Sequence, residues 1–310
     1  MFKRFTNQQL LIALGVILGL YVIALLMDGK KERTFKATLS SLDTAAVSRI
    51  LIEAPNAEPV ELQKQGPAWQ VKLPDGSFVS TGEGVVQTAL ESISRLEAKQ
   101  LISRLEADWS EYEVDSAATR VQVFAGAEPV LNILLGKFAF QGNGGMTHAR
   151  LEGEAETYLV DGYLAPSFRK VANDWRNNTL IQGNQNDWNL LTFSYLADSS
   201  FQLFKGTDNL WRLADSTEVD NSAVATYLNQ ISRLDGGEFI ARRPTNPTPD
   251  FQLAMQDVNG TLVEVKAFAD LETQFLLTSN LNPEAVFNGA SEGLWQKVFV
   301  GMTTFLPANP

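Results

Sequence analysis

The hydrophobic positions of the chain follow two patterns, one continuous run near the start and many short alternations after it. Residues 10–27 are eighteen positions without a charge, LLIALGVILGLYVIALLM, with basic residues on both sides. A helix over this run would measure about 27 Å, close to the apolar thickness of a bilayer, about 30 Å. The run therefore predicts one transmembrane helix, with residues 1–33 as tail, span and juxtamembrane segment.

Two other interpretations of the run are less consistent with its sequence. A cleaved signal peptide would be followed by a small-x-small site, and residues 28–33 (DGKKER) provide none. A buried core helix would show a polar face, which the run lacks. The flanking basic residues are nearly balanced and do not fix the orientation. A short N-terminal tail and the absence of Cys favour a single pass with the large C-terminal domain outside the membrane.

Two glycines within the run suggest a contact between membrane helices. Gly15 and Gly19 are four positions apart, the spacing that lets a second membrane helix approach closely. Glycine is also common in membrane helices for other reasons. These two residues are the candidates for contact with a membrane-protein partner.

The alternating segments occur twice in the same order. Residues 60–64 and 69–71 alternate with period two around a turn, as do residues 201–205 and 211–213, and each pair predicts a β-hairpin. A helical pattern ending in the tetrapeptide ISRL follows at residues 93–96 and again at 231–234. A second hairpin comes next, at 120–134 and at 251–265. The first copy adds another hairpin, at 148–160, and each copy closes with a short helical pattern, at 168–171 and 294–298.

This order predicts an internal duplication. We expect an α+β fold: an N-terminal transmembrane helix followed by two tandem repeats of an antiparallel sheet with helices packed on one face. The repeats would cover residues 34–182 and 187–305. A polar linker, QGNQN at 182–186, would lie between them.

Charge limits the kinds of partner. The segment through residue 33 holds five basic and two acidic residues of the chain's 25 and 36, which leaves 20 basic and 34 acidic residues and a net charge of −14. Nucleic acids and anionic lipid head groups require basic surfaces, so neither is expected as a partner of this part.

Several short motifs resemble the bacterial proteins grouped as domain of unknown function 4340. They are Arg33-Thr34-Phe35, the tryptophan strand at Trp69, Glu111-Tyr112-Glu113-Val114, Leu135-Gly136-Lys137 and Phe168-Arg169. The resemblance implies an auxiliary protein of the bacterial cytoplasmic (inner) membrane, with an extracytoplasmic C-terminal domain, that accompanies ABC transporters, including gliding-associated systems. It supplies no catalytic residues. The second copy has Asn246-Pro247-Thr248-Pro249 where the Glu-Tyr motif belongs, so a site that uses this loop is expected only once.

Candidate chemistry is sparse. The single histidine, His148, has no second His or Cys to complete a zinc site, and a structural role is expected for it. Asp108, Glu111, Glu113 and Asp115 cluster before a strand, as in a solvated loop, although paired carboxylates could serve a glycan or peptide hydrolase. The tryptophans could stack on sugars, but their repeated positions favour core packing. No cofactor or metal site is predicted.

The glycine-rich segment at 142–145 is expected to form the tip of a hairpin, because a strand pattern and not a helix follows it. Phe138 and Phe140 lie beside it, so Phe138, Phe140, Asn143, Gly144 and Gly145 are the candidates for an interaction loop. The sequence thus predicts a non-enzymatic, membrane-anchored binding or scaffold protein, an accessory subunit of a transporter-like envelope complex. The alternatives are an extracytoplasmic hydrolase using paired carboxylates and a tethered solute-binding protein.

Overall fold

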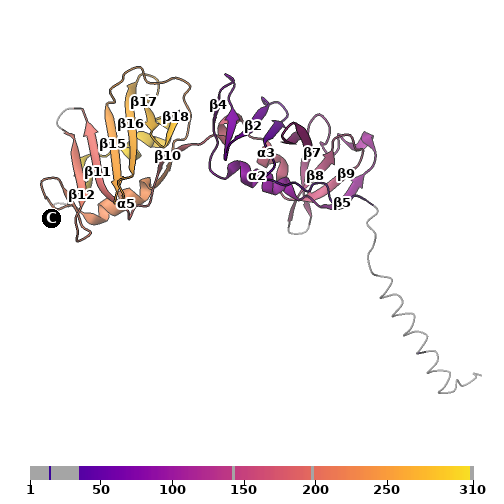
Figure 1. Cartoon of the computed structure of the whole chain (residues 1–310), viewed down its shortest axis with the longest axis horizontal. Helices are drawn as coiled ribbons and strands as arrows, with labels where there is room; N and C mark the ends of the chain where they lie inside the picture. Colours follow the sequence, from indigo (N-terminus) through magenta and orange to yellow (C-terminus); the bar gives the residue numbers. More distant parts are fainter. Residues whose placement is uncertain (1–13, 15–34, 142–143, 197–198, 308–310) are drawn as a thin grey trace, which may run out of the picture.

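Two large antiparallel sheets make up most of the protein. The computed structural model describes residue 14 and residues 35–141, 144–196 and 199–307. Figure 1 shows the two sheets as separate lobes, one built from the N-terminal and one from the C-terminal part of the described chain. Strand β10 lies where the lobes meet.

The N-terminal lobe contains a nine-stranded sheet with the α2 helix against it. The hydrophobic stripe of α2 (Val85–Ser94) buries Val86, Leu90 and Ile93 in the core under the sheet. The short helical elements of this lobe are η1 (Glu106–Asp108), α3 (Leu164–Phe168) and α4 (Ala172–Trp175). In spatial order the strands are β4 (Phe78–Ser80), β3 (Ala68–Lys72), β2 (Val60–Gln65), β1 (Arg49–Glu53), β6 (Thr119–Ala125), β7 (Glu128–Gln141), β8 (Gly144–Leu151), β9 (Thr157–Asp161) and β5 (Ala98–Ser103).

The C-terminal lobe contains a seven-stranded sheet and the α5 helix (Asn221–Ile231). Three short helical elements close it: η3 (Ser291–Gly293), α6 (Leu294–Val298) and η4 (Met302–Phe305). In spatial order the strands are β13 (Trp211–Leu213), β12 (Phe201–Lys205), β11 (Trp188–Tyr195), β15 (Phe251–Asp257), β16 (Leu262–Asp270), β17 (Gln274–Ser279) and β18 (Asn282–Asn288). A separate two-stranded sheet pairs β10 (Thr179–Gln182) with β14 (Arg233–Asp235).

The two sheets share one strand order. The run β3-β2-β1-β6-β7-β8-β9 of the first sheet matches β13-β12-β11-β15-β16-β17-β18 of the second, and α2 and α5 leave their sheets at equivalent points. One backbone contact is also equivalent. The Gly82 N–H donates to the Trp175 carbonyl oxygen at 3.0 Å, and the Asp220 N–H donates to the Phe305 carbonyl oxygen at 2.8 Å. The closing segment of each lobe is thereby fixed to the start of its main helix.

Buried hydrophobic residues form two main clusters, drawn from residues 39–175 and from residues 180–305. Leu180 and Ile181 of β10 pack into the second cluster. The proposed unit boundaries, 34–182 and 187–305, stay a prediction.

The lobes touch directly at their junction. The Ser80 N–H donates to the Glu284 carboxylate at 2.9 Å, and the Asn282 side-chain amide donates to the Asn177 carbonyl at 2.5 Å. The Arg176 guanidinium lies 3.8 Å from the centre of the Phe239 ring.

The expected α+β class is wrong, because the fold is mostly β. Only α2 and α5 exceed five residues among the described helices, at ten and eleven. The pattern expected to close the first copy as one helix is divided into α3 and α4, each about one turn long, and its counterpart α6 has five residues. A one-turn helix has too few backbone hydrogen bonds to be stable without packing against other elements, so these segments stay short. Strands therefore outnumber helices in the fold.

The prediction of an N-terminal transmembrane helix is also corrected. No helix among the described residues is long and apolar enough to cross a membrane, since α5 has only eleven residues and a span needs about twenty. The run at 10–27, with Gly15 and Gly19, lies outside the described residues except for Leu14. The single-pass inner-membrane location, the periplasmic placement that followed from it, and the membrane and membrane-protein partners are withdrawn with the span.

Candidate functional site

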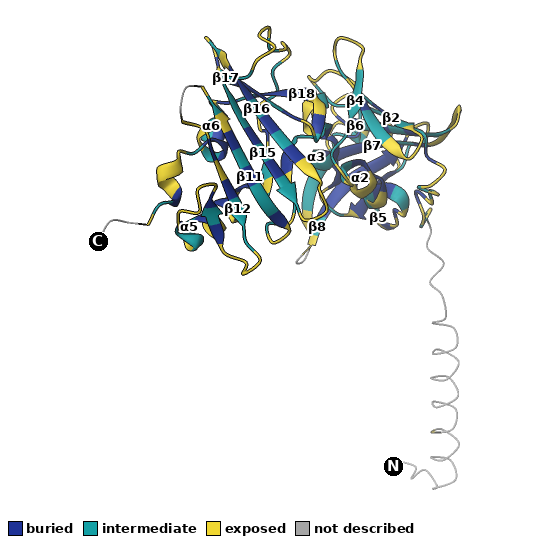
Figure 2. Cartoon of the chain, turned by 60° about the vertical axis from the view of Figure 1, so that its left-hand side comes forward, coloured by how far each residue is buried: buried dark blue, intermediate teal, exposed yellow. Residues whose placement is uncertain are grey.

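The longest hairpin of the protein extends beyond its own sheet. Strand β7 has fourteen residues, but its pairing with β6 ends at Leu135, opposite Thr119. Among the described residues, β8 is the one strand that pairs with residues 138–141, in the register Phe138–Thr147 to Gln141–Gly144. The free end of this hairpin projects from the lobe in both views, with exposed residues beside the loop (Figures 1 and 2).

Three aromatic side chains gather on this free end, and we call Phe138, Phe140 and Tyr163 the aromatic patch. The Phe138 ring contacts Phe140 edge-on at a centroid distance of 4.7 Å and Tyr163 at 4.6 Å. Phe140 is 82% exposed and Tyr163 is 57% exposed. Large apolar groups exposed side by side are typical of contact surfaces, whereas single ones are ordinary.

The predicted glycines stand beside this patch. A Cβ atom at Gly145 would lie 2.7 Å from the Phe138 ring, so only glycine lets the ring lie over β8. Gly144 is exposed and begins β8. Asn143 falls outside the described residues. The structure thus brings four of the five loop candidates together: Phe138, Phe140, Gly144 and Gly145.

A bulge in β7 directs the hairpin out of the sheet. The register of β7 with β8 shifts between Leu135 and Phe138, which leaves Gly136 and Lys137 as the extra residues. The Lys137 N–H donates to the Tyr112 carbonyl at 3.1 Å, and a Cβ atom at Gly136 would lie only 2.2 Å from the same oxygen. The segment 111–114 is therefore the support on which the bulge rests, and glycine is required for its close approach.

His148 lies opposite this bulge and has a structural role. The imidazole is 6% exposed and stacks on the Tyr112 ring at 4.9 Å, with 18° between the planes. Its Nδ1 lies 3.0 Å from the Lys137 carbonyl, and since a carbonyl only accepts, Nδ1 carries the proton. Burial lowers the pKa of His148 below its usual 6.5. The ring is therefore neutral at neutral pH and holds the bulge to segment 111–114.

Arg150 secures the same segment from β8. Its Nε donates to the Val114 carbonyl at 3.0 Å, and its guanidinium lies 3.8 Å from the centre of the Trp109 ring. The Trp109 indole N–H donates to the Ala155 carbonyl at 3.0 Å. Sequence reasoning did not anticipate the roles of Trp109, Arg150 or Tyr163, because each acts through a contact between segments that are far apart in the chain or on different strands. The short 111–114 motif was the one available signal.

Two of the four acidic residues considered for hydrolysis, Asp108 and Asp115, have local structural uses. Asp108 accepts a hydrogen bond from the Ser103 hydroxyl, and Asp115 accepts one from the Ala117 N–H at 3.0 Å. Both bonds stabilise turns on either side of the 111–114 segment. Within the described ranges, no cluster of three or more His, Cys, Asp or Glu residues could hold a metal ion.

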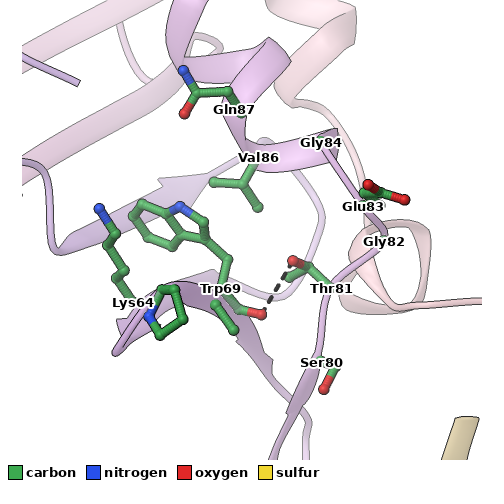
Figure 3. A pocket seen from close by; sticks show the side chains of 11 residues that line it. Lys64, Trp69, Ser80, Thr81, Gly82, Glu83, Gly84, Val86 and Gln87 are labelled. Atoms are coloured by element: carbon green, nitrogen blue, oxygen red, sulfur yellow. Dashed lines mark hydrogen bonds between the residues drawn. The ribbon is translucent and has the colours of Figure 1, made fainter. Parts of the chain in front are cut away.

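A separate pocket of about 370 Å³ lies between the β2–β3 hairpin and the start of α2 (Figure 3). The half-buried Trp69 forms its wall, with Lys64 and Gln87 at the sides. The Thr81 hydroxyl donates to the Trp69 carbonyl at 3.2 Å and so fixes the loop between β4 and α2 to β3. Trp69 also packs against the core cluster, as its repeated position predicted, so this pocket is partly a consequence of core packing. Its counterpart in the other lobe, Trp211, is buried.

Comparisons with known proteins give one match. The sequence model described as "Domain of unknown function (DUF4340)" matches residues 83–254, from the start of α2 into β15. The match includes the aromatic patch and its support, and it spans the junction between the lobes. No curated protein and no solved structure matches the chain. Since the match covers more than half of the chain, this protein belongs to the DUF4340 family.

Proposed function

We propose that this protein is a non-catalytic binding module and that the aromatic patch is its contact surface. The observation that carries the proposal is the 82% exposure of Phe140 next to two further aromatic rings at the free end of a supported hairpin. Burying one such side chain against a partner is worth about 1.5–3 kcal/mol. Aromatic residues are among those that dominate binding energies at interfaces.

The rigidity of the support adds to this proposal. His148, Tyr112 and Arg150 hold the base of the hairpin through stacking and backbone hydrogen bonds. A contact surface that is already ordered loses less conformational entropy on binding than a flexible loop does.

The structural uses of several polar groups support the non-catalytic part of this proposal. The one histidine is buried and bonded to a backbone carbonyl, and Asp108 and Asp115 serve turns. The transporter-like complex suggested by the family resemblance is not part of this proposal, since the family description names no partner.

Affinity purification of the tagged full chain from the cells that produce it, followed by mass spectrometry, tests the proposal. We expect a defined protein complex with the unchanged chain and its loss with Phe140→Ser. Leu271→Ser is the matched control, because Leu271 is fully exposed at the tip of the equivalent hairpin of the other lobe, and it should leave the complex intact. Equal recovery from both variants, or no complex at all, would overturn the proposal.

A further inference from the structure

At the outer edge of β7, residues 138–141 carry backbone groups that pair with no described residue. Gly145, which is opposite Phe140, directs its carbonyl towards β9, where it accepts from the Gly162 N–H at 2.9 Å. The Phe140–Gly145 pair is therefore of the non-hydrogen-bonded type, and the N–H and C=O of Phe140 point away from β8. By the alternation of an antiparallel ladder, the same holds for Phe138, while Ala139 faces β8.

Two other sheet edges in the described part of the chain, those of β4 and β18, are covered. At β4, the Ser80 carbonyl accepts from the Asn177 N–H at 2.8 Å, and at β18, the Val286 carbonyl accepts from the Ile240 N–H at 2.8 Å. Natural proteins also protect edges with charged residues or proline. Residues 138–147 (FAFQGNGGMT) contain neither. The 138–141 edge is thus a template for pairing with another strand.

We propose that the strand that pairs with this edge is residues 138–141 of a second copy of the chain. This inference rests on the proposed function, because it assigns a partner to the aromatic patch. Two copies with a net charge of −11 each repel one another over most of their surfaces. The uncharged segment 138–147 is a place where they can approach without opposing like charges.

The edge is also complementary to itself. In an antiparallel arrangement with a two-fold axis at Ala139, Phe138 of one copy faces Phe140 of the other, and the two exchange backbone hydrogen bonds on each side of the axis. The facing rings form an aromatic cross-strand pair on the side of the sheet that holds Tyr163. Four residues from each copy make a small interface, so the dimer is weak and depends on concentration.

This register makes a specific prediction for Ala139. The two Ala139 residues form a non-hydrogen-bonded pair across the axis, with Cα atoms about 4.5 Å apart, which is within the range that a disulfide spans. The natural chain contains no cysteine, so a single introduced cysteine reports on one position only.

Mild oxidation of the full chain carrying Ala139→Cys tests the proposal. We expect a covalent dimer to form at least about tenfold faster than with Val130→Cys, because pairing raises the effective concentration of the thiols. Val130 is an exposed residue of the same strand, away from the free edge. Sedimentation equilibrium of the unmodified chain should show a mass rising with concentration above 34.1 kDa. Phe140→Lys should abolish that rise.

Equal oxidation rates for Ala139→Cys and Val130→Cys would overturn self-pairing, as would a mass that stays at the monomer value. Thermal unfolding of Phe140→Lys checks that this variant remains folded. If self-pairing fails while recovery of a complex with another protein still depends on Phe140, the proposed function stands without this partner. If that complex is also absent, both proposals fail.

Discussion

The hairpins at equivalent positions of the two sheets, β7–β8 and β16–β17, end in opposite ways. The β7–β8 hairpin extends into an uncharged, aromatic end. The β16–β17 hairpin is shorter and has a charged turn, where Arg242 contacts Asp270 at 2.6 Å and Glu272 at 2.7 Å. Hydrogen bonds from the Thr273 backbone and from Arg242 hold the pKa of Asp270 well below its usual range.

This difference shows how one topology can carry a contact surface in one lobe only. In the C-terminal lobe, Asp270 also accepts from the Glu272 and Thr273 N–H groups at 3.1 and 2.9 Å, so the turn satisfies its own polar groups. In the N-terminal lobe, strand β7 continues past the end of its neighbour β6. It does so at the bulge of Gly136 and Lys137, which rests on residues 111–114. The N-terminal lobe is therefore the lobe in which we place binding.

The largest effect is expected from Gly136→Ala. The added Cβ would overlap the Tyr112 carbonyl oxygen at 2.2 Å, and a backbone atom cannot move aside as a flexible side chain can. We expect the free energy of unfolding to fall by about 3 kcal/mol in urea titrations followed by circular dichroism.

Gly301→Ala in the other lobe is the matched control. Its Cβ would meet only the Thr303 hydroxyl oxygen, at an ordinary 3.6 Å, and a change below about 0.5 kcal/mol is expected. Similar stabilities for the two variants would contradict the close approach that forms the bulge.

A smaller, pH-dependent effect is expected from His148. Burial lowers its pKa in the folded state, so the unfolded chain takes up the proton first as pH falls. Its neutral form contributes fully above about pH 6.5, and stability declines as pH drops below that value. Lys137, Glu111 and Glu113 are the charged groups that act on this ring.

Urea titrations of the unchanged chain and of His148→Gln between pH 7.5 and pH 5 isolate this contribution, because the carboxylates are common to both proteins. The difference in unfolding free energy between them should narrow as pH falls. A difference independent of pH would mean that the pKa of His148 is the same in the folded and the unfolded chain, which contradicts this prediction.

The smallest effect on stability is expected at the aromatic patch itself. Phe140 is mostly exposed, so Phe140→Ser should change the unfolding free energy by less than about 0.5 kcal/mol. Loss of the complex without loss of stability would separate a contact role from a structural one. A large loss of unfolding free energy would mean that Phe140 contributes to the core. It would contradict the conclusion that the β7–β8 hairpin ends in an exposed contact surface.

Alternation in the sequence located strands well where both strand and turn signals were present. The strands predicted at 201–205 and 211–213 are observed as β12 and β13 with the same bounds, because a polar turn separates two clear period-two segments. The pair β17–β18 was not anticipated, and helical patterns at 168–171 and 294–298 turned out to be single turns. The lengths of these helical segments depend on how they pack against the sheet, and hydrophobic periodicity carries no information about that packing.

At the candidate site, the sequence indicated only those residues that lie close to one another along the chain. Phe138, Phe140 and the glycines were recognisable because they are neighbours along the chain. Tyr163 joins them only because β9 pairs with β8 and places it next to Phe138. The bulge depends on a contact between Gly136 and Tyr112, which are more than twenty positions apart, and no pattern within either segment indicates it.

Photo-crosslinking at one position in each hairpin shows whether the β7–β8 hairpin alone contacts a partner. A photoreactive phenylalanine analogue is placed at Phe140 in one version of the full chain and at Leu271 in another, and each is irradiated in the cells that produce it. We expect a discrete adduct from position 140 and none from position 271, with an adduct of twice the chain mass if two copies pair. Adducts of equal yield from both positions, or from position 271 alone, would contradict this expectation.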